Sequence, residues 1–139
     1  MYRATQEIYD ALRQKDGLKV FTDENGNQSE VWLQFGLDAG GSYRIKFISR
    51  DNDYDVAVRV FSLASVSENQ RAKVIPVLND LNCKYRFFKF CCDSDGDVNV
   101  EYDFLMHGTN PAAGAHEVVQ RIVNVLDEVY PMIMRAMWS

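Results

Sequence analysis

The middle of the chain constrains the fold most, because a clear helix start leads into an unusually clear hairpin. Ser67 followed by Gln70 is typical of a capping box, in which each side chain accepts a bond from the other residue's backbone N–H. Further along, two alternating strand patterns in residues 88–92 and 98–106 flank a turn at Gly96, where positive φ costs nothing. We therefore expect a helix that runs directly into a two-stranded antiparallel hairpin.

The helix that starts at Ser67 has an apolar stripe and one irregularity. Its stripe consists of residues at helical spacing: Val74, Ile75, Leu78 and Leu81. Pro76 lies inside this pattern, and proline has no N–H to donate to the preceding turn. The sequence therefore predicts a bend at Pro76, or a first segment that is short or distorted.

Strand patterns fill the region before this helix. Apolar and polar side chains alternate in four segments: 18–22, 30–36, 43–50 and 54–63. Asn25-Gly26 is a strong hairpin signal, and the later connections are also short. Because short links join antiparallel neighbours, we predict a four-stranded antiparallel meander with one buried face.

Helices are predicted at both ends of the chain. Residues 2–16 carry Thr5, Ile8, Tyr9 and Leu12 at helical spacing, and the last helix runs from about Pro111 to near Met137, with a kink expected at Pro131. Apolar residues of the last helix exceed one stripe, which predicts burial against the core and against a partner subunit. The fold class is α+β, in the order helix, four strands, helix, two strands, helix.

Composition limits the classes of function. The chain has 139 residues, which suits one domain spanning 1–139, and a net charge of −5. An acidic surface disfavours binding to nucleic acids and to anionic membranes. No apolar run is long enough to span a bilayer or to direct secretion, and three cysteines make no disulfide framework. We therefore expect a cytoplasmic protein.

Two acidic turns resemble cation sites. Asp93, Asp95 and Asp97 surround Gly96, but a calcium loop beginning at Asp93 would need Gly at position 98 and Glu at position 104, which hold Val and Phe. The preferred interpretation is a solvated hairpin turn, and the same holds for the turn containing Asp53. The alternative is a small-molecule- or metal-responsive regulator that uses the turns near Asp53 and Asp95.

No catalytic constellation stands out. His107 and His116 are separated by a loop, and the adjacent Cys91 and Cys92 point to opposite faces of a strand. We therefore expect no catalytic residue, no metal ligand, no cofactor and no enzyme activity. An unrecognised enzyme would need a cleft that joins one of the histidines to an Asp or a Cys.

Two groups of residues could bind a partner. The basic residues of two adjacent predicted strands, Arg44, Lys46, Arg50 and Arg59, would form with Trp32 a basic and aromatic sheet surface for an acidic peptide. An ordinary salt-bridged sheet face is the alternative.

The second group lies at the end of the last helix. Met134, Met137 and Trp138 belong to a methionine-rich segment that suits an adaptable interface, although core packing explains such spacing equally well.

The helix end and the hairpin resemble the YbjN family of bacterial sensory transduction regulators. The resemblance rests on three phrases: Leu78-Asn79-Asp80-Leu81-Asn82, Phe87-Phe88-Lys89-Phe90 and Asp93-Ser94-Asp95-Gly96-Asp97-Val98. That family's fold is similar to the chaperones of type III secretion, dimers that bind extended segments of effector proteins. The resemblance implies a non-enzymatic, chaperone- or adaptor-like module with a protein or peptide partner, and a homodimer. It carries over no catalytic residue.

Overall fold

The computed structural model describes residues 1–15, 17–52, 55–105 and 110–139, and it has the predicted α+β class. Its described helices are α1 (Arg3–Arg13), the short 3₁₀ turn η1 (Glu68–Gln70), α2 (Arg71–Lys84) and α3 (Pro111–Met137). Its described strands are β1 (Val20–Asn25), β2 (Gln28–Gly36), β3 (Ser42–Ser49), β4 (Asp55–Ser65), β5 (Phe88–Cys92), β6 (Asp97–Tyr102) and β7 (Phe104–Leu105). Within these residues, no helix combines the length and the apolar character needed to cross a membrane.

One antiparallel sheet contains all the described strands. Its order is β1-β2-β3-β4-β6-β5, and the short β7 pairs with the start of β4. The predicted meander is confirmed as β1 to β4, and the predicted hairpin is β5 and β6. The second hairpin strand was predicted to reach residue 106. Asp103 instead separates β6 from β7, and residue 106 lies outside the described residues.

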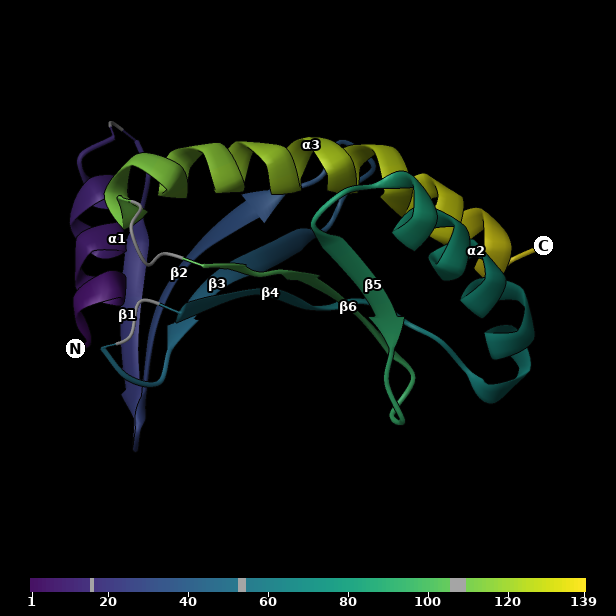
Figure 1. Cartoon of the computed structure of the whole chain (residues 1–139). Helices are drawn as coiled ribbons and strands as arrows, with labels where there is room; N and C mark the ends of the chain where they lie inside the picture. The colour runs from purple at the N-terminus through teal and green to yellow at the C-terminus, as the bar shows by residue number, and fades with distance from the viewer. Residues whose placement is uncertain (16, 53–54, 106–109) are drawn as a thin grey trace.

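All three helices lie on one face of the sheet. Figure 1 shows the sheet curving as an arch beneath α3, with α1 beside its β1 end and α2 beside its β5 end. The strand side chains that point toward the helices pack with them in one apolar core, which includes Phe47, Phe90, Leu126 and Ile133. The opposite face of the sheet lines the inside of the arch and has no helix against it.

The capping box at Ser67 is confirmed, with the Gln70 side chain accepting a bond of 3.0 Å from the Ser67 N–H. It opens the 3₁₀ turn, and α2 follows without interruption through Pro76. The carbonyl that loses its bond to Pro76 belongs to Ala72, which is exposed to water, so the missing donor costs little. The 3₁₀ turn before α2 is the distorted first segment that the sequence offered as one of its two predictions.

The first hairpin turns one residue later than its sequence suggests. β1 runs from Val20 to Asn25, and Asn25 pairs with Gln28, so the two-residue loop is Gly26-Asn27. Gly26 has φ of 59°, which suits the first loop position of a type II′ turn. The strand predicted at 18–22 is therefore displaced toward the turn.

Helix α3 begins as predicted, with Pro111 in its first turn and the Asn110 side chain accepting a bond of 3.0 Å from Ala112 N–H. It continues through Pro131 to Met137, and Figure 1 shows it curving over the sheet. Val125, Met132 and Ala136, which lie off its main stripe, are half-buried and pack against the core. These apolar side chains off the main stripe are thus partly buried within the chain itself.

Candidate functional site on the open face of the sheet

The open face carries one row of side chains that crosses six strands. The antiparallel register makes these residues cross-strand neighbours in the order Phe21, Trp32, Lys46, Arg59, Glu101 and Lys89. Because side chains alternate faces along a strand, the adjoining residues point into the core, as the buried Val31, Phe47 and Val58 do. Four basic or aromatic positions singled out in the sequence therefore lie on one surface: Trp32, Arg44, Lys46 and Arg59.

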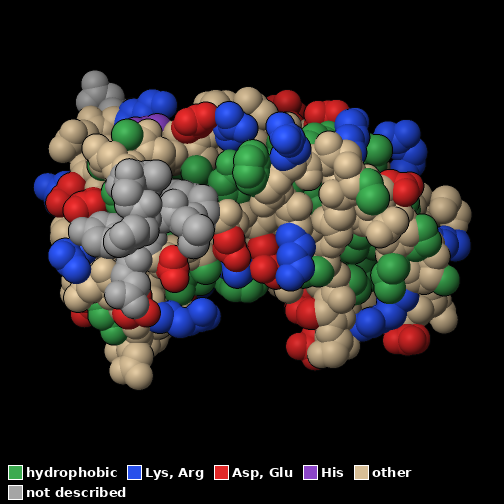
Figure 2. Space-filling view, in the orientation of Figure 1, with side chains coloured by type: hydrophobic (Ala, Val, Ile, Leu, Met, Phe, Trp, Pro, Cys, Tyr) green, Lys and Arg blue, Asp and Glu red, His purple; other side chains and the backbone are tan. Residues whose placement is uncertain are grey.

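This face is hollowed. Figure 2 shows an indentation at the lower edge, between the tip of β1 and β2 and the tip of the β5–β6 hairpin, bordered by charges of both signs. A cavity of about 430 Å³ opens where β3 ends and β4 begins, and Ile48, Ala57 and Arg59 are among its lining residues. The inside of the arch therefore offers a concave, mixed surface to a ligand.

An aromatic and cationic stack stands at the β1 end of the row. The Phe21 and Trp32 rings stack with centroids 4.3 Å apart and planes 19° from parallel. The Arg44 guanidinium carbon lies 4.0 Å from the Trp32 ring centroid, and the indole N–H donates to Asp23 at 3.0 Å. Since β2 lies between β1 and β3, Trp32 is held between Phe21 and Arg44. We call Phe21, Trp32 and Arg44 the platform.

Lys46 occupies the middle of the row and is already paired. Its ammonium lies 3.7 Å from a carboxylate oxygen of Glu30, a residue with only 6% of its surface exposed. It also lies 5.9 Å from the ring centroid of Phe61, which is half exposed. Glu30 therefore compensates the charge of Lys46, whose side chain lies beside Phe61.

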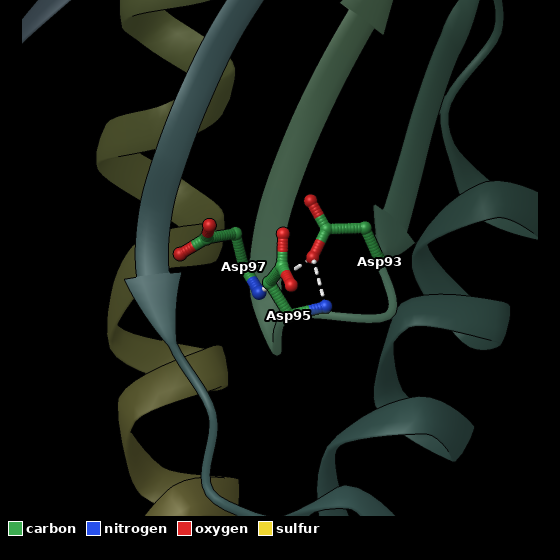
Figure 3. A group of neighbouring side chains, drawn as sticks. All are labelled: Asp93, Asp95 and Asp97. Carbon is green, nitrogen blue, oxygen red and sulfur yellow. Dashed lines mark hydrogen bonds between the residues drawn. The ribbon is translucent and has the colours of Figure 1, made fainter.

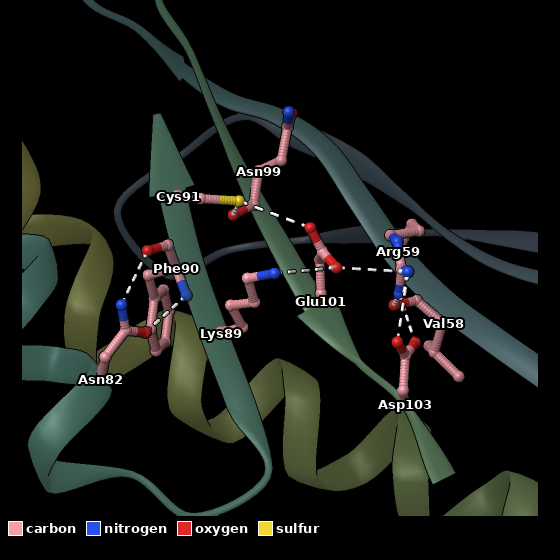
Figure 4. Close-up of polar contacts among 9 residues, drawn as sticks. All are labelled: Val58, Arg59, Asn82, Lys89, Phe90, Cys91, Asn99, Glu101 and Asp103. Atoms are coloured by element: carbon pink, nitrogen blue, oxygen red, sulfur yellow. Dashed lines mark hydrogen bonds and ion pairs between the residues drawn. The ribbon is translucent and has the colours of Figure 1, made fainter. Parts of the chain in front are cut away.

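The far end of the row is a ladder of ion pairs, shown in Figure 4. Arg59 contacts Glu101 at 3.2 Å and also binds Asp103, while Lys89 lies 4.0 Å from Glu101. The Cys91 thiol donates to Glu101 at 3.4 Å, and burial, with Glu101 beside it, raises the pKa of this thiol. Cys91 is therefore a protonated neighbour of the ladder and no activated nucleophile.

The methionine-rich end of α3 lies in the helical layer, away from the platform. Met137 is buried in the core with 6% of its surface exposed, and Met134 is half-buried against it. Trp138 follows the helix and is 76% exposed. The two groups of predicted partner-binding residues therefore do not form one surface.

The acidic turn of the hairpin is held together by its own backbone. Carboxylate oxygens of Asp93, Asp95 and Asp97 come within 4.8 Å of one another (Figure 3). One oxygen of Asp93 accepts from Asp95 N–H at 2.9 Å and from Asp97 N–H at 3.0 Å, and the other accepts from Asn99 at 3.0 Å. The bond from Asp97 leads the interactions that lower the pKa of Asp93. The observed contacts give Asp93 a structural role, and Asp53 lies outside the described residues.

The described histidine has a structural contact too. His116 Nε2 lies 3.0 Å from the Ala11 carbonyl oxygen and so joins α3 to α1. His107 lies outside the described residues.

Asn82 makes a contact that the sequence did not predict. Its amide accepts from Phe90 N–H at 2.6 Å and donates to Phe90 C=O at 3.0 Å (Figure 4). Both bonds run from the end of α2 to the outer edge of β5, eight residues later in the chain. The recognisable Asn of the helix phrase therefore joins α2 to the sheet.

Phe21 and Asp23 at the β1 end of the open face, and Glu101 and Lys89 at its other end, are residues that sequence reasoning missed. Placing the first turn at Asn25-Gly26 would set Phe21 opposite Glu30, whereas the observed turn sets it opposite Trp32. The aromatic pair at positions 21 and 32 was the available signal, since cross-strand aromatic pairs stabilise antiparallel strands.

A family model matches residues 39–133, from the β2–β3 connection to near the end of α3, and its description is "YbjN: Putative bacterial sensory transduction regulator". The match includes Arg44 and the hairpin and leaves Phe21 and Trp32 outside. No match was found among curated proteins or among solved structures. The similarity to type III secretion chaperones therefore stays a prediction. Because the matched region covers more than half of the chain, the protein belongs to the YbjN family.

Proposed function

We propose that this regulator acts by binding a segment of a partner protein across the open face of its sheet. The observation that carries the proposal is the cross-strand row inside the arch, with the exposed Phe21 and the half-buried Trp32 at one end. Aromatic and arginine side chains are enriched where proteins bind one another. The predicted similarity to chaperones that bind extended segments favours an extended partner, and a chaperone- or adaptor-like role.

No enzymatic role is proposed. Among the described residues, Cys91 keeps its proton and His116 bonds a backbone carbonyl, so neither is arranged as a nucleophile or base. The alternative of a metal-responsive regulator rests on the turn around Asp95. Both oxygens of Asp93 already accept hydrogen bonds within the hairpin, which gives this carboxylate a structural role, and we do not extend the proposal to the turn.

A homodimer also stays a prediction. A dimer formed through α2 and the end of α3 would have to bury Ile75 and Trp138, which are 49% and 76% exposed. It would leave the inside of the arch free, because these residues belong to the helical layer.

Site-directed photo-crosslinking tests the proposed surface. A photoreactive benzoylphenylalanine is placed at Gln34, which is exposed on the open face, and in a second protein at Gln120, which is exposed on α3. We expect discrete cross-linked species in extracts of the host from position 34 alone, and their loss when unlabelled protein competes. Equal cross-linking from both positions, or none from position 34, would contradict the proposal.

A further inference from the structure

We infer that the platform binds a carboxylate of an acidic peptide segment through Arg44, with Phe21 contacting an apolar neighbour of that carboxylate. The inference rests on the proposed function and specifies the chemistry of its partner. Two of the three platform residues, Phe21 and Trp32, lie outside the region that matches the family.

Stacking prepares Arg44 for such a ligand. The guanidinium lies over the Trp32 ring at 4.0 Å, and Trp32 is itself fixed by Phe21 and by the bond to Asp23. A stacked guanidinium keeps its planar set of N–H donors free at its edge, and this set matches both oxygens of a carboxylate. Little side-chain entropy is then lost when a ligand binds.

Charge pairing distinguishes Arg44 from the cations of the cross-strand row. Lys46 pairs with Glu30, Arg59 pairs with Glu101 and Asp103, and Lys89 lies beside Glu101. Across the described part of the chain, no carboxylate lies within salt-bridge distance of Arg44, which is exposed. Among the described residues of the open face, Arg44 and the cavity-lining Arg50 have no carboxylate within salt-bridge distance, and of these two only Arg44 lies over an aromatic ring.

The surroundings of Arg44 favour an isolated carboxylate over a polyanion. Asp23 and Glu30 lie close by, and the whole chain carries a net charge of −5. A nucleic acid would bring a row of phosphates against these carboxylates and gain one pairing. An acidic side chain flanked by an apolar one gains the same pairing and covers Phe21, which is 43% exposed.

Fluorescence titration with defined peptides tests the inference. Trp138→Phe leaves Trp32 as the only indole, so its emission reports binding at the platform. The probes are a short peptide of alternating Asp and Phe and its counterpart with Asn in place of Asp. We expect the Asp peptide to bind about ten-fold more tightly, because a two-bond charged contact is worth roughly 1.4 kcal/mol or more. Arg44→Gln should remove this preference and Arg44→Lys should keep part of it.

Lys89→Gln is the matched control, because it neutralises a paired cation on the same face and should leave the preference unchanged. Equal affinity for the two peptides would overturn the carboxylate contact. So would tighter binding of a single-stranded oligonucleotide, a dimer that buries Trp32, or binding of neither peptide. If cross-linking from position 34 persists in any of these cases, the proposed function survives while the acidic chemistry fails. Loss of that cross-linking would end the proposed function itself.

Discussion

At the scale of single residues, Asn82 shows how one amide can close the edge of a sheet. β5 is an edge strand, and unpaired backbone groups at an edge invite pairing with other chains. Asn82 satisfies both the N–H and the C=O of Phe90, whose side chain is 1% exposed. Its amide thus takes the place of a further strand at the centre of β5.

Asn82→Ala is expected to lower the free energy of unfolding by about 1–3 kcal/mol, because it leaves two backbone groups at a buried position without partners. Asn79→Ala is the matched control, since Asn79 is exposed on the same helix and should change stability little. Urea denaturation measures both variants. Equal effects of the two substitutions would contradict the structural role of the Phe90 contact.

At the scale of elements, the strand alternation was predictable, and the irregularity inside β4 was not. Val56, Val58 and Val60 alternate as the sequence suggests, but β4 then shifts its pairing with β6 between Val60 and Ala64. Ser62 adopts φ of 57° in this bulge, and its N–H donates to the Asn99 side chain at 2.9 Å. This bulge depends on a hydrogen-bond partner from another strand, so the sequence of β4 alone does not predict it.

Among the described glycines, Gly96 is the one at which an added Cβ would come nearest to another atom. Its φ is 88°, and an added Cβ would lie 2.2 Å from the carbonyl oxygen of Val66, just before η1. Gly96→Ala should therefore destabilise the protein by more than about 2 kcal/mol, as a left-handed backbone cost and a backbone clash combine.

Gly26→Ala is the matched comparison for Gly96→Ala. Gly26 also has positive φ, but nothing lies within 4 Å of its added Cβ, so only the backbone cost of about 1 kcal/mol remains. Thermal unfolding compares the two variants. A Gly26→Ala variant that melts as low as Gly96→Ala would show that the approach to Val66 is unimportant.

At the scale of the whole molecule, local patterns predicted the two antiparallel units but not how they join. The pairing of β6 with β4 connects residues about forty positions apart, and only this pairing aligns Arg59 with Glu101 and extends the row to Lys89. Of the candidate site, Trp32, Arg44, Lys46 and Arg59 were expected on one sheet surface and lie on one face, because alternation within adjacent strands is local; their role in binding stays a prediction. Phe21 and the pairing of three cations with carboxylates depend on register and tertiary contacts, which sequence spacing does not determine.

The joining of the helical layer to the sheet supplies the last prediction. Ser29 and Ser49 are cross-strand partners on β2 and β3 and are 2% and 1% exposed. The Ser29 hydroxyl lies 2.7 Å from that of Thr5 on α1, whereas the Ser49 hydroxyl is buried and has no hydrogen-bond partner among the described residues. Ser29→Ala should therefore lower the free energy of unfolding by about 1 kcal/mol, while Ser49→Ala should raise it by up to about 1 kcal/mol.

Chemical denaturation of the two single variants separates these effects, since both delete one buried oxygen atom from neighbouring positions. Hydrogen exchange in α1 gives a second measurement: it should become faster in Ser29→Ala alone, because only Ser29 bonds a residue of that helix. Destabilisation by Ser49→Ala equal to that by Ser29→Ala would mean that the Thr5 contact does not hold α1 to the sheet. The opposite signs expected for this pair test whether polar bonds between the layers position α1 beside β1, at the end of the arch that carries the platform.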